Sequence, residues 1–283
     1  MARVVSLLHY PIKGCAGTPV SGSVVTAAGL AHDRSFMVVD HDYVFRTQRR
    51  DPRLAVIRPE VRDDGDVLTL HAPGMAELSV KVDRDGARRG VDLFGNSYTG
   101  IDQGEPVARW LTEVLDAPSR LVRVPPEHDR ATDGETPGTA GYADSAAVLL
   151  IGRTSLDLLH ARLVEQGGEP LPMNRFRPNI VVDGWDEPHV EDSVRRVTIG
   201  NVLLGYTKLA IRCAVTLVDQ ETGARAGPEP LRTLATYRRS AAGGVTFGAK
   251  FAVLRAGELA VGDEVQVERW AAAAGSMPTS RRR

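Results

Sequence analysis

The sequence predicts a mainly β protein with a few α-helices, an α+β fold built from two β-rich halves. Short runs rich in valine and leucine recur along the chain and are separated by Gly, Asp and Pro. Several runs alternate apolar and polar residues, as residues 78–82 do, which is the period of half-buried strands. Two stretches instead space their apolar residues as an amphipathic helix does.

In the first half we expect strands and one helix. The predicted strands are residues 4–8, 23–27, 35–39, 55–57, 67–70 and 78–82. The helix is predicted over residues 105–115, where Pro106 suits the first turn. Its apolar residues at helical spacing are Val107, Trp110, Leu111, Val114 and Leu115. We expect the face that carries Trp110 to pack on a sheet.

A long loop is predicted between the halves. Residues 125–141 lack periodicity and are rich in Pro, Gly and polar residues, which is typical of a linker or a functional flap. The sequence therefore divides into an N-terminal domain over 1–125, a second domain over 126–270 and a disordered tail over 271–283. In the second domain we expect a helix over 154–166. The strands expected there are residues 148–151, 180–182, 197–199, 202–204, 251–254 and 262–267.

The composition limits the classes of function. The chain has 283 residues, 42% of them hydrophobic and 25% charged, as in ordinary globular proteins. Its formal net charge of -1 argues against a nucleic-acid binder, so small molecules or proteins are the expected partners. The N-terminus lacks the features of a signal peptide and no apolar run is long enough to span a membrane. We therefore predict a cytoplasmic protein without a membrane partner, whose two cysteines are reduced and too few to hold an iron–sulfur cluster.

Cys213 is the candidate for the protein's chemistry. It follows Arg212, and the fixed guanidinium charge would favour the thiolate, which is both a nucleophile and a ligand for soft metals. A single cysteine of this kind is otherwise an ordinary small apolar residue, which is how we interpret Cys15. Local sequence alone leaves the role of Cys213 open.

Three cations stand in strand-like or turn-like contexts. These are Lys13, Arg34 and Arg177, the last of which precedes a proline. An arginine held in a rigid frame presents a fork of donors that suits phosphate or a planar heterocycle. Taken singly, each of them is best interpreted as a solvated charge. The seven histidines show no metal-ligand spacing, and the motifs of nucleotide-binding loops, serine hydrolases and zinc hydrolases are absent.

Together these residues resemble the MOSC family, named after the C-terminal domain of molybdenum-cofactor sulfurase, in the two-part form with an N-terminal β-barrel. The resemblance covers about residues 3–269, and its closest pattern is that of the amidoxime-reducing components and their bacterial counterparts. The motifs that carry it are Tyr10-Pro-Ile-Lys-Gly-Cys15, Gly29-Leu30, Asp33-Arg34, Thr47-Gln48-Arg49, Pro52-Arg53-Leu54, Tyr142-Ala143-Asp144-Ser145, Phe176-Arg177-Pro178-Asn179-Ile180, Arg212-Cys213 and Val218-Asp219-Gln220-Glu221-Thr222-Gly223.

The resemblance implies a molybdenum–molybdopterin cofactor in a cleft between the two domains. Cys213 would be the protein ligand to molybdenum, and a soft thiolate suits a metal that already has dithiolene ligands. The other implied cofactor-binding residues are Lys13, Gly14, Arg34, Asp144, Ser145, Arg177, Asn179 and Arg212. Gly14 stands where relatives commonly have serine, so we expect a backbone N–H to replace that side-chain contact.

The implied function is a molybdenum-dependent oxidoreductase that reduces N-hydroxylated compounds such as hydroxylamines and amidoximes. Some relatives continue into a ferredoxin-like domain that this sequence lacks, so we expect a separate electron-donor protein of ferredoxin, flavin or cytochrome type. Two alternatives stay open: a sulfur carrier with a persulfide on Cys213, and a module that binds the pterin without turnover. We expect residues 125–141 and Trp185 to border the substrate pocket. Asp219 and Glu221 we assign to a turn.

Overall fold

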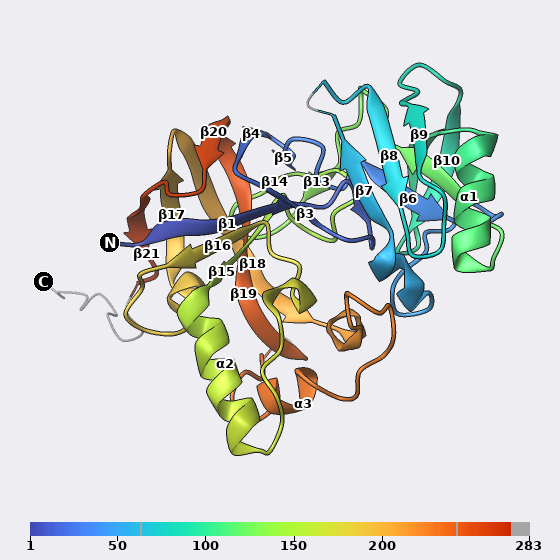
Figure 1. The fold of residues 1–283 in the computed structure, drawn as a ribbon. Coiled ribbons are helices and arrows are strands. Elements are labelled where there is room, and N and C mark those ends of the chain that lie inside the picture. Colours follow the sequence, from blue (N-terminus) through green and yellow to red (C-terminus); the bar gives the residue numbers. More distant parts are fainter. Residues whose placement is uncertain (63, 242, 273–283) are drawn as a thin grey trace, which may run out of the picture.

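The computed structural model describes residues 1–62, 64–241 and 243–272 and consists mostly of β-strands, which confirms the mainly β prediction (Figure 1). The strands form two lobes. The first consists of β2, the strands from β6 to β12 and helix α1, and the second contains the long strands β18 and β19 together with helix α2. The tail predicted over 271–283 falls almost entirely outside the described residues.

The second lobe is built on a sheet of eight strands. Their order across the sheet is β21 (Val265–Trp270), β17 (Val194–Ile199), β18 (Val202–Arg212), β19 (Val245–Arg255), β15 (Val148–Gly152), β16 (Ile180–Asp183), β1 (Arg3–His9) and β3 (Thr18–Val20). A three-stranded sheet of β20 (Gly257–Ala260), β4 (Gly22–Thr26) and β5 (Gly29–Leu30) completes the lobe. The side chains of both sheets share one apolar core.

Apart from residues 12–15, the first thirty residues therefore pack with the second half of the chain. Strand β1 pairs antiparallel with β16, and β4 pairs antiparallel with β20 (Figure 1). At the end of this segment Gly29 has a φ of +111°, and a Cβ added there would lie 2.6 Å from the carbonyl oxygen of Ala147. Only glycine allows the two backbones to approach so closely. The division near residue 125 stays a prediction, and these N-terminal strands cross it.

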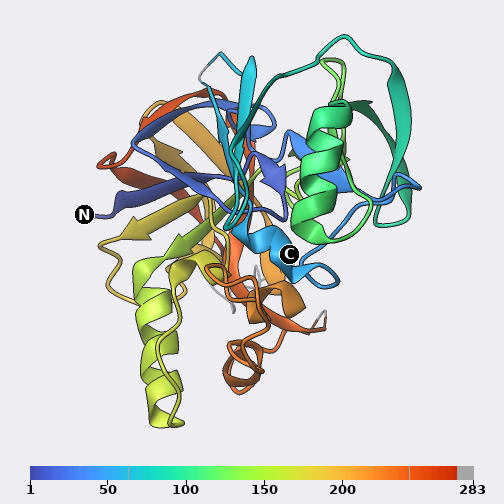
Figure 2. The ribbon, with the colours of Figure 1, turned by 45° about the vertical axis from the view of Figure 1, so that its right-hand side comes forward.

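The first lobe consists of two sheets and a helix. One sheet has the order β10 (Arg88–Leu93), β11 (Asn96–Asp102), β12 (Arg120–Arg123), β6 (Phe36–Val39) and β2 (Ile12–Lys13). The other has the order β7 (Arg58–Val61), β8 (Val67–His71) and β9 (Leu78–Lys81). Helix α1 (Glu105–Leu115) lies along this lobe (Figure 2) and buries its apolar face against the two sheets. The Trp110 indole donates a hydrogen bond to the carbonyl of Ala76 at 2.7 Å. The prediction of a core Trp110 is confirmed.

Residues 55–57 do not form the predicted strand. They belong largely to the 3-10 helix η1 (Pro52–Val56), whose proline lies in the first turn. Proline fixes a φ that suits a helical turn, and this local preference outweighs the β-branched residues that follow it. The turn directs Leu54 and Ala55 into the core, so the apolar pattern came from burial and not from strand pairing.

The remaining elements join the sheets. The predicted loop over 125–141 contains a small hairpin of β13 (Ala131–Thr132) and β14 (Gly138–Thr139). The other helical segments are α2 (Arg153–Glu165), η2 (Met173–Arg175), η3 (Val190–Asp192), η4 (Ala214–Leu217) and α3 (Leu231–Leu234). In the described part of the chain, none of the helices combines the length and apolar character that crossing a membrane requires.

A buried carboxyl group anchors the start of α2. Both oxygens of Glu191, which is fully buried, lie within 2.9 Å of the Ser155 hydroxyl, and one of them accepts the backbone N–H of Gly152 at 3.2 Å. Burial raises the pKa of Glu191 to about 7. Because this pKa is higher in the folded chain than in the unfolded one, the folded protein binds the proton more tightly.

We predict that this group makes stability depend on pH near neutrality. Its stabilising contribution is complete below the unfolded pKa of 4.5 and is lost as the pH rises through about 7. Between pH 5 and pH 8 the free energy of unfolding should fall by about 2 kcal/mol more in the wild type than in Glu191→Gln. Urea unfolding at both pH values measures this difference. The exposed Glu187→Gln control should keep the wild-type dependence, and an unchanged profile in Glu191→Gln would contradict the prediction.

Candidate functional site

All the predicted site residues line one cleft between the two lobes. Its cavity volume is about 300 Å³. The first part of the chain contributes Lys13, Gly14 and Arg34, and the second part contributes Asp144, Ser145, Arg177, Asn179, Arg212 and Cys213. Residues separated by 200 positions in the sequence are thus brought together, as a shared ligand would require.

Cys213 presents an exposed thiol at the end of a long strand. It directly follows β18 and is the N-cap of η4, where its carbonyl accepts hydrogen bonds from the N–H and the hydroxyl of Thr216, both at 3.0 Å. Cys15 differs from Cys213 in its location and in the accessibility of its thiol. Its side chain is fully buried in the core of the first lobe, and burial raises the pKa of its thiol to about 12. Cys15 is a core residue, as predicted, and Cys213 is the accessible thiol.

Two arginines from different lobes lie against the ring of Tyr10. The guanidinium carbons of Arg34 and Arg177 are 4.4 Å and 4.3 Å from the ring centroid. Both residues have positive φ angles, 47° and 57°, which are uncommon outside glycine. The buried Asp33 carboxylate pairs with Arg34 at 2.6 Å and so offsets part of the repulsion between the two cations. Burial also raises the pKa of Tyr10 to about 12, so the ring stays neutral.

Asn179 holds this junction in place. Its side-chain oxygen accepts hydrogen bonds from Arg34 at 2.9 Å and from the N–H of Leu149 at 3.1 Å. Its side-chain nitrogen donates to the carbonyl of Leu8 at 3.1 Å and to Asp33 at 3.0 Å. The amide is thereby fully engaged with protein groups. Within the cleft, Asn179 positions Arg34.

Three buried donors of cleft-lining arginines have no protein partner among the described residues, and one of them is the Nε of Arg46. Arg212 donates through Nη2 to the carbonyl of Phe176 at 2.6 Å, but its Nε is unpaired. Arg177 donates through Nη1 to the side chain of Gln220 at 3.2 Å, but its Nη2 is unpaired. Burial lowers the pKa of Arg212 to about 10, so it is still a cation at neutral pH. Unpaired buried donors of this kind favour a ligand with acceptor atoms.

The cleft is strongly electropositive. Among the described residues that line it, Asp144 is the one carboxylate. The cations are Lys13, Arg34, Arg46, Arg49, Arg177, Arg212 and Lys250. Asp144 forms an ion pair with Lys13. The charges of Lys13 and Lys250 lower the pKa of Asp144 below its usual range.

Sequence reasoning missed Lys250. It lies in the middle of β19 and donates a hydrogen bond to the Ser145 hydroxyl at 2.7 Å. Burial lowers its pKa to about 8, against the opposing charge of Asp144. The available signal was a charged residue inside an otherwise apolar strand, where solvated charges are rare.

Two glutamines, one of which lines the cleft, connect the lobes. Gln48 and Gln220 exchange side-chain hydrogen bonds of 3.2 Å and 3.0 Å, and Gln48 also donates to the carbonyl of Gly14 at 2.6 Å. Gln220 belongs to the predicted turn, which is confirmed. One oxygen of Asp219 accepts the N–H groups of residues 221 and 222, and Gly223 has a φ of +65°.

The predicted pocket loops are not where the sequence suggested. The described residues that line the cleft include neither Trp185 nor any residue of 125–141. The expectation that both segments border the pocket was therefore wrong. Trp185 instead packs against the core of the second lobe. In the loop, the buried Arg130 donates to the carbonyls of Gly141, Ala143 and Asp144 at 2.6, 2.5 and 2.8 Å. The loop thus supports the cleft wall through hydrogen bonds without lining the cavity itself. Its polar composition is consistent with this role.

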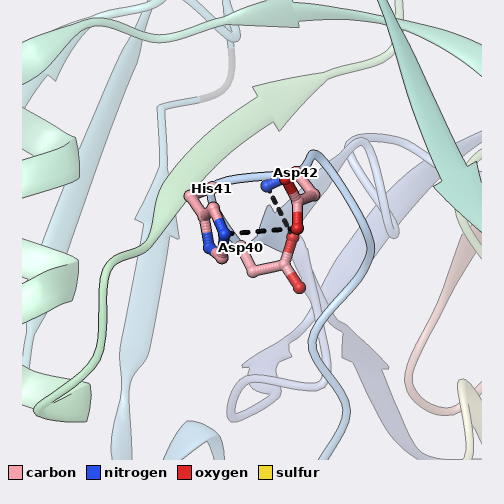
Figure 3. Close-up of side chains that lie close together, drawn as sticks. All are labelled: Asp40, His41 and Asp42. Carbon is pink, nitrogen blue, oxygen red and sulfur yellow. Dashed lines mark hydrogen bonds and ion pairs between the residues drawn. The ribbon is translucent and has the colours of Figure 1, made fainter.

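A separate acidic cluster lies on an exposed turn. Asp40, His41 and Asp42 place their ligand atoms within 4.8 Å of one another (Figure 3). One oxygen of Asp40 already accepts the N–H groups of Asp42 and Val44, both at 3.0 Å. The hydrogen bonds of the turn explain why these side chains lie together, and we therefore do not propose a metal site here.

Comparison with known proteins identifies the class. Residues 1–118 match the MOSC N-terminal beta barrel domain and residues 137–266 match the MOSC domain. The chain therefore belongs to the MOSC family, in the form with both domains. It is 34% identical over 285 residues to mitochondrial amidoxime-reducing component 1 of Homo sapiens, covering 94% of this chain and 82% of that protein.

Two further proteins of the family are similar to this chain. Mitochondrial amidoxime reducing component 2 of Rattus norvegicus is 34% identical over 278 residues, covering 90% of this chain and 80% of that protein. Molybdenum cofactor sulfurase of Danio rerio is 32% identical over 264 residues, which are 87% of this chain but 31% of that protein.

We predict that Arg130 is needed to hold the cleft wall formed by residues 141–145. In Arg130→Met three carbonyls lose a charged donor, which should lower the free energy of unfolding by about 3 kcal/mol. Chemical unfolding measures the loss, and amide hydrogen exchange should become faster in residues 141–145. Arg109→Met, an exposed change on α1, should alter neither quantity. Equal stability of the two variants would contradict the assigned role.

Proposed function

We propose that this protein is a molybdenum-cofactor-dependent reductase of N-hydroxylated compounds that receives electrons from a separate donor protein. The observation that carries the proposal is an exposed cysteine thiol in a cleft lined by seven cations and one carboxylate. The family and the amidoxime-reducing relatives support the same function. A thiolate ligand and an anion-binding wall are what a dithiolene cofactor with a phosphate group needs.

The residues of the cleft fit the cofactor by their chemistry. Cys213 would ligate the metal, and the unpaired donors of Arg177 and Arg212 would bind acceptor atoms of the pterin or its phosphate. Lys13 adds charge from the first lobe, while Arg34 and Asn179 fix the arrangement. The bound cofactor supplies the two-electron chemistry, and the protein supplies orientation and charge.

Lys250 and Ser145, which line the same cleft as the thiol, would handle protons. Reduction of an N–OH group to N–H releases water and consumes two electrons and two protons. Lys250 holds a proton on Nζ at neutral pH and, with a pKa of about 8, is close to the range in which it can release one. Its hydrogen bond to the Ser145 hydroxyl gives that proton a defined direction within the cleft.

The cytoplasmic location expected from the sequence stays a prediction, because the relatives are named as mitochondrial proteins. The type of donor protein, whether ferredoxin, flavin or cytochrome, is likewise an expectation. The relatives are named components, and a component that works together with other redox proteins agrees with the proposed separate donor.

We predict that Cys213 is essential for metal binding and Cys15 is not. When all proteins are free of cofactor, Cys213→Ala and Cys213→Ser should unfold at the wild-type temperature, because the thiol is exposed and contributes no packing. When made in a cofactor-competent host, both variants should lack molybdenum and turnover. Elemental analysis of protein from a cofactor-competent host should give roughly one molybdenum per chain in the wild type and in Cys15→Ser. Stoichiometric zinc without molybdenum would refute the assignment.

The substrate class is tested by a side-by-side assay. The cofactor-loaded protein is given reduced viologen as an artificial one-electron donor, together with hydroxylamine, benzamidoxime, a sulfoxide or nitrate. We expect donor oxidation with the two N-hydroxylated compounds. Turnover of nitrate or the sulfoxide alone would place the protein in another class of oxygen-atom transfer.

A sulfur carrier is the second candidate. An exposed thiol beside a cation also suits a persulfide anion, and one relative is named molybdenum cofactor sulfurase. This alternative predicts a mass increase of one sulfur on Cys213 that a reductant reverses. Intact-protein mass spectrometry of the wild type and Cys213→Ala distinguishes the two candidates.

A further inference from the structure

Phe94 has a backbone conformation that phenylalanine rarely adopts. It lies at the tip of the β10–β11 hairpin, where Leu93 pairs with Asn96 and leaves Phe94 and Gly95 as a two-residue turn. Their φ angles are 59° and 78°, and such turns favour Asn or Gly at both positions. A bulky side chain such as phenylalanine is strained there, and strain of this kind is concentrated at functional sites.

The Phe94 ring lies at the cleft and not in the core. Its residue is 43% exposed, although its edge-to-face contact with Phe45 brings the two ring centroids within 4.5 Å. The Nζ of Lys13 is 4.9 Å from the Phe94 centroid, and the guanidinium carbon of Arg49 is 5.8 Å from it. All four residues line the cleft. A group that rests on this ring therefore lies next to the cations of the proposed cofactor site.

The second lobe offers an apolar side chain to the same cleft. Ile211 is 49% exposed and precedes Cys213 by two residues. Its side chain lines the cleft, where an apolar group of a ligand could cover it. The cleft thus combines an aromatic surface from one lobe with an aliphatic surface from the other, next to a cationic wall and an accessible thiol.

We propose that Phe94 and Ile211 form an apolar clamp that holds a flat aryl group of the substrate, and that Phe94 is a specificity-determining residue. This inference rests on the proposed function and narrows it to aryl N-hydroxylated compounds. An aryl ring stacked on Phe94 leaves its polar N–OH group to face the cleft. For an amidoxime, R–C(=NOH)NH2 accepts two electrons from the donor protein and two protons. The N–O bond breaks, and R–C(=NH)NH2 and water are formed.

The first test compares an aryl with a non-aryl substrate. Benzamidoxime and hydroxylamine are assayed with the cofactor-loaded protein and reduced viologen. In Phe94→Ala the KM for benzamidoxime should rise about tenfold, which corresponds to about 1.4 kcal/mol. The kinetics with hydroxylamine should stay unchanged, and Phe94→Tyr should behave as the wild type. Equal losses on both substrates, or no change on either, would overturn the clamp.

Direct binding separates this proposal from the proposed function. Isothermal titration of benzamidoxime into the cofactor-loaded wild type and Phe94→Ala needs no turnover. Binding that weakens about tenfold in Phe94→Ala supports the clamp even if no substrate is reduced, in which case the reductase function alone fails. A wild type that does not bind benzamidoxime, or binds it no better than Phe94→Ala, refutes the clamp.

A third variant tests the strain. Asn is favoured where Phe94 stands, so Phe94→Asn should raise Tm by about 2 °C while it weakens benzamidoxime binding as Phe94→Ala does. Val24→Ala changes an exposed apolar residue outside the cleft and should leave benzamidoxime binding unchanged. A lower Tm in Phe94→Asn would show that the ring serves the stability of the hairpin, and would overturn the proposal.

Discussion

The structure depends on keeping two like charges together across the boundary between the lobes. Arg34 and Arg177 both rest on Tyr10, and Arg34 also donates to the carbonyl of Arg177 at 3.3 Å. Buried cations repel strongly in a medium of low polarity, so the contact requires the Asp33 carboxylate and the Asn179 amide beside it. Each of these side chains is held in position by contacts with the others. The relative position of the lobes, and with it the cleft, follows from that arrangement.

An excess of positive charge in the cleft has an energetic consequence. Seven cations face one carboxylate, and burial lowers the pKa of both Lys250 and Arg212. The protein without a bound anion therefore contains unfavourable interactions that an anionic ligand would relieve. Active sites commonly lower stability in this way for the sake of binding. The uncharged Gln48–Gln220 pair joins the lobes at the same place without adding to the repulsion.

Sequence patterns predicted the strands and helices well where the periodicity was local. Helix α1 and strands β1, β8 and β9 lie close to their expected bounds, whereas residues 55–57 form a 3-10 turn because Pro52 dominates there. The site residues were found from the family resemblance, and composition alone would have left each cation a solvated charge. Lys250 and Phe94 were not found, because their importance comes from strands and turns that only the tertiary fold brings to the cleft. The loop over 125–141 misled us, since a polar loop that braces a wall has the same composition as one that borders a pocket.

Strand β1 pairs with β16 and strand β4 pairs with β20, so the second lobe cannot fold completely until the late strands have been synthesised. Strands β1 and β4 leave the ribosome before the strands of the first lobe from β6 onward, yet their partners β16 and β20 lie near residues 180 and 260. The first lobe, whose strands are nearly contiguous, can fold while the early strands still wait. Until β20 has emerged, β4 is an unpaired strand edge, which is the kind of surface that chaperones protect from aggregation.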